Sequence, residues 1–223
     1  MSTYRYYFPL GVFFVAILLI TNTISVKIVQ LGSFSVAAGI IIFPISYIFG
    51  DILTEVYGYR GSRPIIWLGF AAQIFMSLCY WLAQQLPAAP FWPHQESYEL
   101  ILGAVPRIVL ASMIAYLVGE FANSFVLSRL KVWMNGKHLW VRTISSTLVG
   151  EGIDSFLFGI IAFAGILPGS ALWITILSGY GLKVAYEILA TPFTYAIVGY
   201  LKRAENIDVF DERTSYNPFR LRE

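Results

Sequence analysis

Charged residues are scarce in this chain. Asp, Glu, Lys and Arg make up only 13% of its 223 residues, whereas hydrophobic residues make up 57%. Because a soluble domain carries about 25% charged residues, this composition disfavours the soluble classes and indicates a protein that crosses a membrane several times. The formal net charge of +2 is also small, so we expect no nucleic-acid partner.

Cysteine and histidine are also rare. Cys79 is the single cysteine, which excludes an intrachain disulfide and a cysteine-based metal cage. His94 and His138 fall in expected loops far apart in the chain, so they do not form a metal-binding pattern. The sequence contains no nucleophile elbow, phosphate-binding loop or dinucleotide fingerprint. We therefore expect no catalytic residues, no metal and no cofactor.

Six apolar segments each have about the 20 residues that a helix needs to cross a bilayer. They predict an all-α bundle of transmembrane helices over residues 1–201, followed by a charged, loosely ordered cytoplasmic tail over residues 202–223. Pro44 is expected to kink the second span. In the connection before the fourth span, residues 96–102 fit either a short interfacial helix or a plain surface loop. The expected spans are 8–28, 36–56, 64–86, 106–128, 142–166 and 170–200.

Lysine and arginine predict the orientation of the bundle. All of the 15 basic residues except Lys27, Arg107 and Lys183 lie before the first span, after the last span, or in the loops that follow spans two and four. These segments all lie on the same side of a six-span bundle. Both termini are therefore expected in the cytoplasm.

The two halves of the chain contain matching residues. Asn22-Thr23 resembles Asn123-Ser124, and Gly50-Asp51 resembles Gly150-Glu151, each pair about 100 residues apart. Since each half would contain three spans, such halves would be inverted relative to each other in the membrane, as in many secondary transporters. Coincidence is the alternative, because few residues match.

The fifth span carries two acidic residues, Glu151 and Asp154, in an otherwise apolar segment. Residues at i and i+3 share one face of a helix. Because a charge in the middle of a bilayer costs at least a few kcal/mol, ionisable residues inside spans are functional candidates. We predict that these two acids line a central substrate site.

Other polar residues are expected at the same depth. Asp51 fits either a gating pair or a substrate ligand, and Glu120 and Asn123 lie one turn apart in the fourth span. Lys183 has two possible partners, either Glu187 at i+4 or the acids of the fifth span.

Near the end of the second span, Glu55 is expected to meet water or Arg60. More acids than lysines are thus expected at depth, which suits a cation, a transported proton or a ligand that donates hydrogen bonds.

A guanine-like base is one such ligand, because its ring N–H and exocyclic amino group form a donor pair that a carboxylate accepts in bidentate fashion. Aromatic rings in the spans are candidates for stacking on a planar base, although each ring alone is more often a packing residue. They include Phe43, Tyr47, Phe156, Phe158, Tyr180 and Tyr186.

Four segments carry a resemblance to a known family. They are FPISYIFGDILTEVYGYRGSR (43–63), PRIVLASMIAYLVGEFANSFVLSRLK (106–131), RTISSTLVGEGIDSFLFGIIAF (142–163) and GYGLKVAYEILATPFTYAIVGYLKR (179–203). They resemble the queuosine precursor transporters, a bacterial and archaeal group among the vitamin-uptake-like membrane proteins.

The resemblance implies a six-span importer in the cytoplasmic (inner) membrane. Its substrates would be 7-deazaguanine bases, such as 7-cyano- or 7-aminomethyl-7-deazaguanine, which feed a tRNA modification. Combining this with the buried acids, we expect the base to contact Glu151 and Asp154, surrounded by Asp51, Glu120, Asn123, Lys183, Tyr47, Phe43 and Tyr180.

Two other classes stay open. Six-span vitamin-binding proteins also serve as substrate-capturing subunits of ATP-driven complexes, but the small-xxx-small spacing that often marks their first span is missing, since Val15 follows Gly11 and Ile20 follows Ala16. This favours a transporter that works alone or as a homodimer. A membrane-embedded enzyme is the third possibility, and it would convert the ligand instead of moving it.

Overall fold

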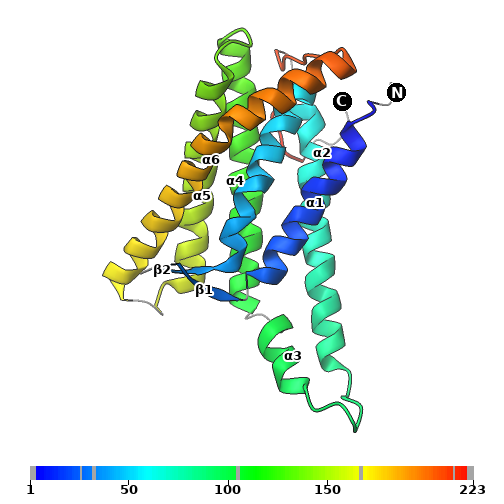
Figure 1. Ribbon diagram of the computed structural model, residues 1–223, viewed down its shortest axis with the longest axis vertical. Coiled ribbons are helices and arrows are strands. Elements are labelled where there is room, and N and C mark those ends of the chain that lie inside the picture. Colours follow the sequence, from blue (N-terminus) through cyan, green and yellow to red (C-terminus); the bar gives the residue numbers. More distant parts are fainter. Residues whose placement is uncertain are drawn as a thin grey trace.

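The structure is a computed structural model that describes residues 4–25, 27–31, 34–103, 106–165, 168–212 and 214–219. These residues form a bundle of α-helices with one short β-hairpin (Figure 1). The elements are α1 (Tyr7–Ile24), β1 (Ile28–Leu31), β2 (Phe34–Ala37), the 3-10 helix η1 (Ala38–Ile41), α2 (Phe43–Gln85), α3 (Gln95–Leu102), α4 (Pro106–Trp133), α5 (Leu139–Phe163) and α6 (Gly169–Glu205).

Helices α1, α2, α4, α5 and α6 contain segments long and apolar enough to cross a membrane. Their outer faces carry large apolar side chains, such as Phe8, Leu189 and Phe193, which are 75%, 76% and 71% exposed. Asp51, Glu55 and Glu120 are instead fully buried. Apolar groups outside and charged groups inside are the arrangement expected of a protein surrounded by lipid. The chain is therefore a multi-pass helical membrane protein.

Helix α2 contains both the second and the third expected span. Its 43 residues are interrupted at Gly58, where φ is 76° and ψ is 171°. This backbone region is essentially restricted to glycine, because a Cβ would clash there. The chain reverses direction at this point, so that α2 consists of two legs, 43–57 and 59–85 (Figure 1).

The first described residues lie beside the end of α6. The backbone N–H groups of Arg5 and Tyr6 donate hydrogen bonds to the Glu205 carboxylate at 3.1 and 2.6 Å. The bend at Gly58 and the α4–α5 connection lie at this same end of the bundle, whereas α3 lies at the opposite end (Figure 1). We call these the tail end and the α3 end.

Two details of the expected spans were wrong. Residues 28–31 and 34–37 form antiparallel strands, with Val29 opposite Val36, where the sequence analysis placed the end of one helix and the start of the next. β-Branched and aromatic residues in these segments favour strands. Pro44 does not kink a helix, because it lies in the first turn of α2, where a missing N–H leaves no hydrogen bond unmade.

The short helix over the α3 end is confirmed. Helix α3 covers Gln95–Leu102, and α4 begins at Pro106 as expected. The fifth and sixth spans correspond to α5 and α6, whose limits differ from the predicted ones by five residues or fewer.

The tail packs against the bundle, so the expectation that it is loosely ordered was wrong for its described residues. Asp211 accepts hydrogen bonds from the Tyr59 backbone N–H at 2.7 Å and from the Ser128 hydroxyl at 2.5 Å. The break at Gly58 leaves the Tyr59 N–H without a partner in its own helix, so the tail supplies the acceptor that a helix start requires. Further along, the Trp67 indole donates to the Pro218 carbonyl at 2.7 Å.

Candidate functional site

Helices α5 and α6 meet at an ion-paired cluster. Glu151 and Asp154 lie on one face of α5, as their spacing predicts, and are 1% and 5% exposed. The Lys183 ammonium on α6 lies 2.8 Å from the Glu151 carboxylate and 2.5 Å from that of Asp154. Of the two partners weighed for Lys183, the structure therefore selects the acids of α5.

Helix α2 brings two aromatic residues to this cluster. The Lys183 ammonium lies 4.3 Å from the centre of the Phe43 ring, within the range of a cation–π interaction. Tyr47 is buried, and a Cβ added to Gly119 of α4 would lie 2.7 Å from its hydroxyl and 2.9 Å from the Asp154 Cβ. Gly119 is thus where α2, α4 and α5 come together.

Helix α4 contributes two polar residues between α2 and α5. The Asn123 amide donates to one oxygen of Asp51 at 2.6 Å, while the second Asp51 oxygen has no hydrogen-bond partner within the described residues. Glu120 is fully buried, and both its oxygens lack a partner in the same part of the chain. It lies close enough to Glu151 and Asp154 for their charges to repel its own.

Two glycines allow this close approach to α4. Gly50 packs on the Glu120 carboxylate, and a Cβ at Gly150 would lie 2.6 Å from that of Asn123. These are the glycines that precede Asp51 and Glu151 in the two matching segments of the sequence. The second and fifth spans therefore flank the same helix, with an acid from each close to it.

Glu187 is a member of this cluster that the predicted site left out. It lies one turn after Lys183 on α6, is 1% exposed, and has no hydrogen-bond partner for either oxygen among the described residues. Its charge repels that of Asp51 on α2. The sequence did carry a signal for Glu187, because it is an acid inside a span. Its i,i+4 spacing led us to weigh it only as an ion-pair partner of Lys183.

The cluster contains more acid than base. We call Asp51, Glu120, Glu151, Asp154 and Glu187 the carboxylate cluster, and Lys183 is the ammonium that pairs with it. Two like charges 4 Å apart repel by about 4 kcal/mol at the effective dielectric constant of a protein surface, and by more inside. The five acids are therefore not all ionised unless a further cation or a hydrogen-bond donor joins them. Among the described residues, no group of His, Cys, Asp and Glu is arranged to hold a metal ion.

Tyr180 and Phe156 lie at the edge of this region. The Tyr180 hydroxyl donates to the Leu148 carbonyl of α5 at 3.1 Å, which places its half-buried ring beside Gly152. Phe156 is 47% exposed and packs against Trp173, so it faces the outside of the bundle. Of the two roles weighed for such rings, packing therefore fits Phe156 better than stacking on a ligand.

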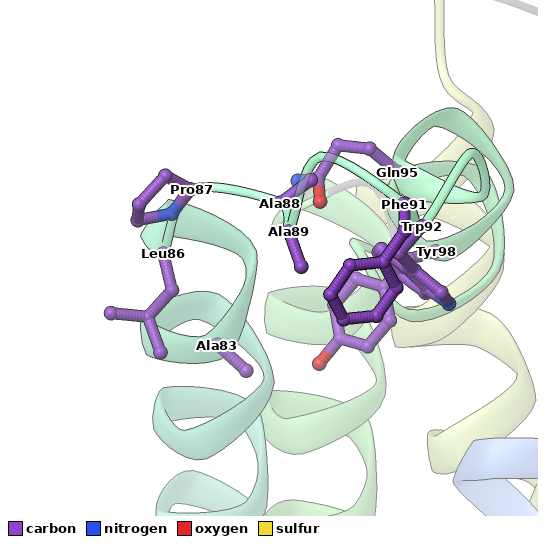
Figure 2. Close-up of a pocket in the computed structure, with 9 residues that line it drawn as sticks. All are labelled: Ala83, Leu86, Pro87, Ala88, Ala89, Phe91, Trp92, Gln95 and Tyr98. Atoms are coloured by element: carbon purple, nitrogen blue, oxygen red, sulfur yellow. The ribbon is translucent and has the colours of Figure 1, made fainter.

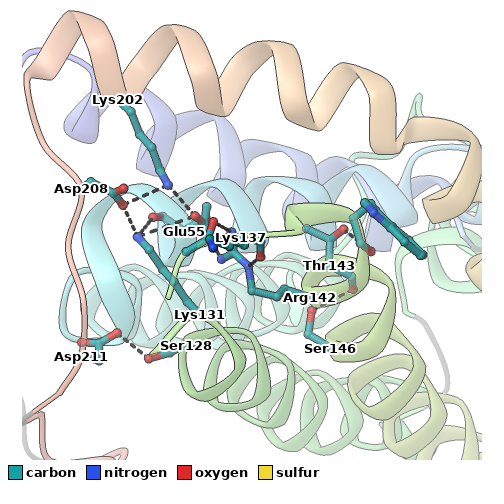
Figure 3. A network of polar contacts seen from close by, with 12 residues as sticks. Glu55, Ser128, Lys131, Lys137, Arg142, Thr143, Ser146, Lys202, Asp208 and Asp211 are labelled. Atoms are coloured by element: carbon teal, nitrogen blue, oxygen red, sulfur yellow. Dashed lines mark hydrogen bonds and ion pairs between the residues drawn. The ribbon is translucent and has the colours of Figure 1, made fainter. Parts of the chain in front are cut away.

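A second polar cluster lies nearer the tail end (Figure 3). Glu55, one turn after Asp51 on α2, forms ion pairs with Arg142 of α5 and with Lys202 of α6, the latter at 2.5 Å. Lys131 of α4 donates to the Glu55 backbone carbonyl at 2.5 Å and lies 3.6 Å from its carboxylate. The expectation that Glu55 meets water or Arg60 was wrong, because three cations from other helices surround it.

Asp208 joins this cluster from the tail. Its carboxylate lies 2.5 Å from the Lys131 ammonium and 2.9 Å from that of Lys202. We call Glu55, Lys131, Arg142, Lys202 and Asp208 the tail-end network. It ties α2, α4, α5, α6 and the tail together.

The α3 end has a surface hollow of about 290 Å³ (Figure 2). It is lined by Ala83, Leu86, Pro87, Ala88, Ala89, Phe91, Trp92, Gln95 and Tyr98. This lining carries no Asp, Glu, Lys or Arg, and it is open to the surroundings. The carboxylate cluster is instead enclosed, since its acids are at most 5% exposed. The acids are therefore shielded from the surroundings in this structure.

Buried ionisable groups inside a bundle of apolar helices are typical of proteins that move polar solutes across membranes. The chain belongs to a family of this class. The family model described as "Putative vitamin uptake transporter" matches residues 37–197, which is more than half of the chain. The protein is accordingly a membrane transporter and not an enzyme.

Individual relatives agree with this assignment and with the resemblance found in the sequence. The chain is 29% identical over 192 residues to a "Probable queuosine precursor transporter" of Bacillus subtilis, covering 85% of this chain and 80% of the relative. It is 26% identical over 160 residues to a "Queuosine precursor transporter" of Escherichia coli, covering 72% and 70%. Among solved structures, none matches the chain.

Proposed function

We propose that this protein imports queuosine precursors, which are 7-deazaguanine bases, and that the acids of the carboxylate cluster on α2, α4 and α5 bind the base. The names of its relatives support the substrate class. The observation that carries the proposal is the set of buried acceptor oxygens on Asp51 and Glu120 that lack a partner within the described residues. A buried acceptor without a donor is costly, and a ligand rich in N–H groups removes that cost.

The chemistry of the base matches the residues. In the proposed complex, the ring N–H and the exocyclic amino group of the base donate hydrogen bonds to carboxylate oxygens. The acceptors are either Glu151 and Asp154 together or the two oxygens of Glu120. Phe43 and Tyr47 offer aromatic faces on the side of α2. An aminomethyl substituent would bring a cation, which the excess of acid favours.

The proposed topology has six crossings, with α2 contributing two. Two observations support it. The chain reverses direction at Gly58, and the basic loops, the start of α1 and the end of α6 all lie at the tail end. Basic segments prefer the cytoplasm, so both termini would face inward across a cytoplasmic membrane. The inverted repeat and a homodimeric assembly remain predictions from the sequence.

The tail-end network explains how the site would stay closed toward the cytoplasm. Under this proposal its ion pairs break when the bundle opens inward, and they re-form when it opens outward. Alternating access requires two such arrangements around one central site.

The test is uptake in cells that lack both precursor synthesis and their own transporter. With this chain expressed alone, we expect queuosine to return to tRNA when a 7-deazaguanine base is supplied at low concentration. Glu151→Gln and Asp154→Asn should lower initial uptake at least about tenfold, since each removes a charge-assisted hydrogen bond. Expression in the membrane, followed with a tag, should match the wild type.

Glu96→Gln is the matched control, because Glu96 is an exposed acid of α3, remote from the cluster. It should transport like the wild type. Wild-type rates in both Glu151→Gln and Asp154→Asn would contradict the proposed site. Absence of queuosine despite good expression would contradict a self-sufficient importer and favour a subunit that needs an ATP-driven partner.

A further inference from the structure

Two acids of the carboxylate cluster, one on α2 and one on α6, form no ion pair with a cation among the described residues. Asp51 on α2 is fully buried, and Glu187 on α6 is 1% exposed. One oxygen of Asp51 and both oxygens of Glu187 have no hydrogen-bond partner within the described residues. Glu187 lies close enough to Asp51 for the two negative charges to repel each other. These two carboxylates therefore form a pair. Its α6 member, Glu187, is not one of the proposed contacts to the base.

The surrounding charges do not neutralise this pair. Lys183 lies one turn before Glu187, but its ammonium is held by Glu151 at 2.8 Å and Asp154 at 2.5 Å on α5. Glu120 of α4 and Glu151 of α5 both add negative charge. The Asn123 amide satisfies only one Asp51 oxygen. Protonation of one acid of the pair removes the repulsion, because only one negative charge then remains.

The position of the pair suits a proton on its way through the protein. Tyr47, Asp51 and Glu55 occupy successive turns of the first leg of α2. Tyr47 borders the acids of α5, whereas Glu55 belongs to the tail-end network with its three cations. Asp51 therefore lies between the proposed substrate site and the tail end, which is the side where a released proton would reach water.

We propose that Asp51 and Glu187 form the proton-coupling site of this transporter, so that a proton enters the cell with each molecule of base. A proton from outside binds a carboxylate oxygen of the pair, and the loss of repulsion allows α2 and α6 to close. When the site opens inward, the O–H bond breaks and the proton leaves to water at the tail end. The base is unchanged, and no other bond forms or breaks. This inference rests on the proposed function, since it adds a driving force to the same transport.

Coupling follows from the geometry of closure. Without the proton, two negative charges on facing helices oppose the approach of α2 to α6, and the closed arrangement is disfavoured. With the proton alone, the acceptors of Glu120 stay unpaired in a closed site. The doubly loaded protein removes both costs, so the base and the proton cross together.

The experiment uses the purified full chain in proteoliposomes and a radiolabelled 7-deazaguanine base. Counterflow, which needs no gradient, reports whether the protein carries the base at all. A pH gradient, acidic outside by one unit, then reports coupling. One pH unit is a tenfold ratio of proton concentrations across the membrane. If one proton enters with each base, this gradient should drive about tenfold accumulation of the base in the wild type. Dissipating the gradient with a protonophore should abolish it.

The decisive variant is Glu187→Gln, which cannot hold or release a proton. We expect counterflow within about twofold of the wild type, since the proposed contacts to the base are intact, but no accumulation under the pH gradient. Glu187→Asp keeps a titratable group and should restore accumulation at a lower rate. Glu96→Gln, an exposed acid on α3, is the control and should behave as the wild type.

The outcomes separate the two claims. Counterflow without gradient-driven accumulation in the wild type would overturn proton coupling and leave the proposed function standing. Full accumulation by Glu187→Gln would overturn the assignment of the coupling site. Absence of counterflow in the wild type would overturn the proposed substrate, and this inference with it. A measurement that needs no variant is the rise in external pH that accompanies base entry in weakly buffered vesicles, and its absence would also overturn coupling.

Discussion

Replacement of Lys183 by Met should destabilise this protein strongly. The ammonium of Lys183 pairs with both Glu151 and Asp154, and its side chain is only 13% exposed. Met preserves the length and the apolar stem of the side chain but removes the charge. Two buried acids would then remain in the bundle without a cation.

The expected size of the effect follows from the burial of the pair. Removing one partner of a buried salt bridge costs about 3–5 kcal/mol, because it leaves an uncompensated charge. For a chain of this length, each kcal/mol lowers the melting temperature by about 2–4 °C, which gives a decrease of roughly 6–20 °C. Part of this loss would be relieved if the acids took up protons.

The assay is thermal unfolding of the purified protein in detergent, followed by the fraction that stays monodisperse. The double variant Lys183→Met/Glu151→Gln should recover at least half of the lost melting temperature, because one of the two uncompensated charges is gone. Lys183→Met alone within about 2 °C of the wild type would refute the argument, since an ion pair of this burial cannot be removed without cost.

Two further predictions concern the tail end. Gly58→Ala should destabilise the protein by about 1–3 kcal/mol and weaken tail packing, because φ is 76° there and a Cβ would lie 3.0 Å from the Asp211 carboxylate; thermal unfolding would show this, and an unchanged melting temperature would contradict it. Partial burial works against ionisation of Asp208, but hydrogen bonds from Lys131 and Lys202 outweigh it and lower its pKa. A lowered pKa adds stability that is present above the ordinary Asp value of about 3.9 and is lost as pH falls through the folded-state value. Pepsin should therefore cleave the tail increasingly as the pH falls through the folded-state pKa of Asp208. In Asp208→Asn, trypsin should cleave the tail even at neutral pH. Resistance equal to that of the wild type at neutral pH in both tests would show that this ion pair does not hold the tail.

The sequence predicted the helical membrane class and most helix limits because both depend on local signals. Apolar length marked α1, α4, α5 and α6, and Pro106 with its neighbours marked the start of α4. The strands over residues 28–31 and 34–37 were missed, and residues 28, 36 and 37 were assigned to helix ends, because a short apolar segment does not by itself distinguish a strand from a helix.

Ionic partners were harder to predict, because they depend on how helices rotate and tilt against one another. The spacing of Lys183 and Glu187 is compatible with a pair on one helix, yet α5 presents two acids to the same ammonium. In the same way, Glu55 meets Arg142, which is 87 residues away, instead of nearby Arg60. Spacing identifies which residues share a face, but it does not identify what that face meets.

The tail was misjudged for a related reason. Its composition is polar and charged, which is typical of a mobile end. Its packing depends on the backbone N–H of Tyr59, which the break at Gly58 leaves without a helical partner. This N–H donates a hydrogen bond to the Asp211 carboxylate of the tail. This need arises only once α2 folds back on itself.

The central claim is that buried carboxylates bind the donor pair of a guanine-like base. The most direct measurement is the affinity of the purified protein for a 7-deazaguanine base and for the same base without its exocyclic amino group. Loss of a charge-assisted hydrogen bond should weaken binding by about 10- to 100-fold. The difference should shrink in the variant whose carboxylate accepts that bond, either Glu120→Gln or Glu151→Gln. Equal affinity for the two bases in the wild-type protein would contradict the account.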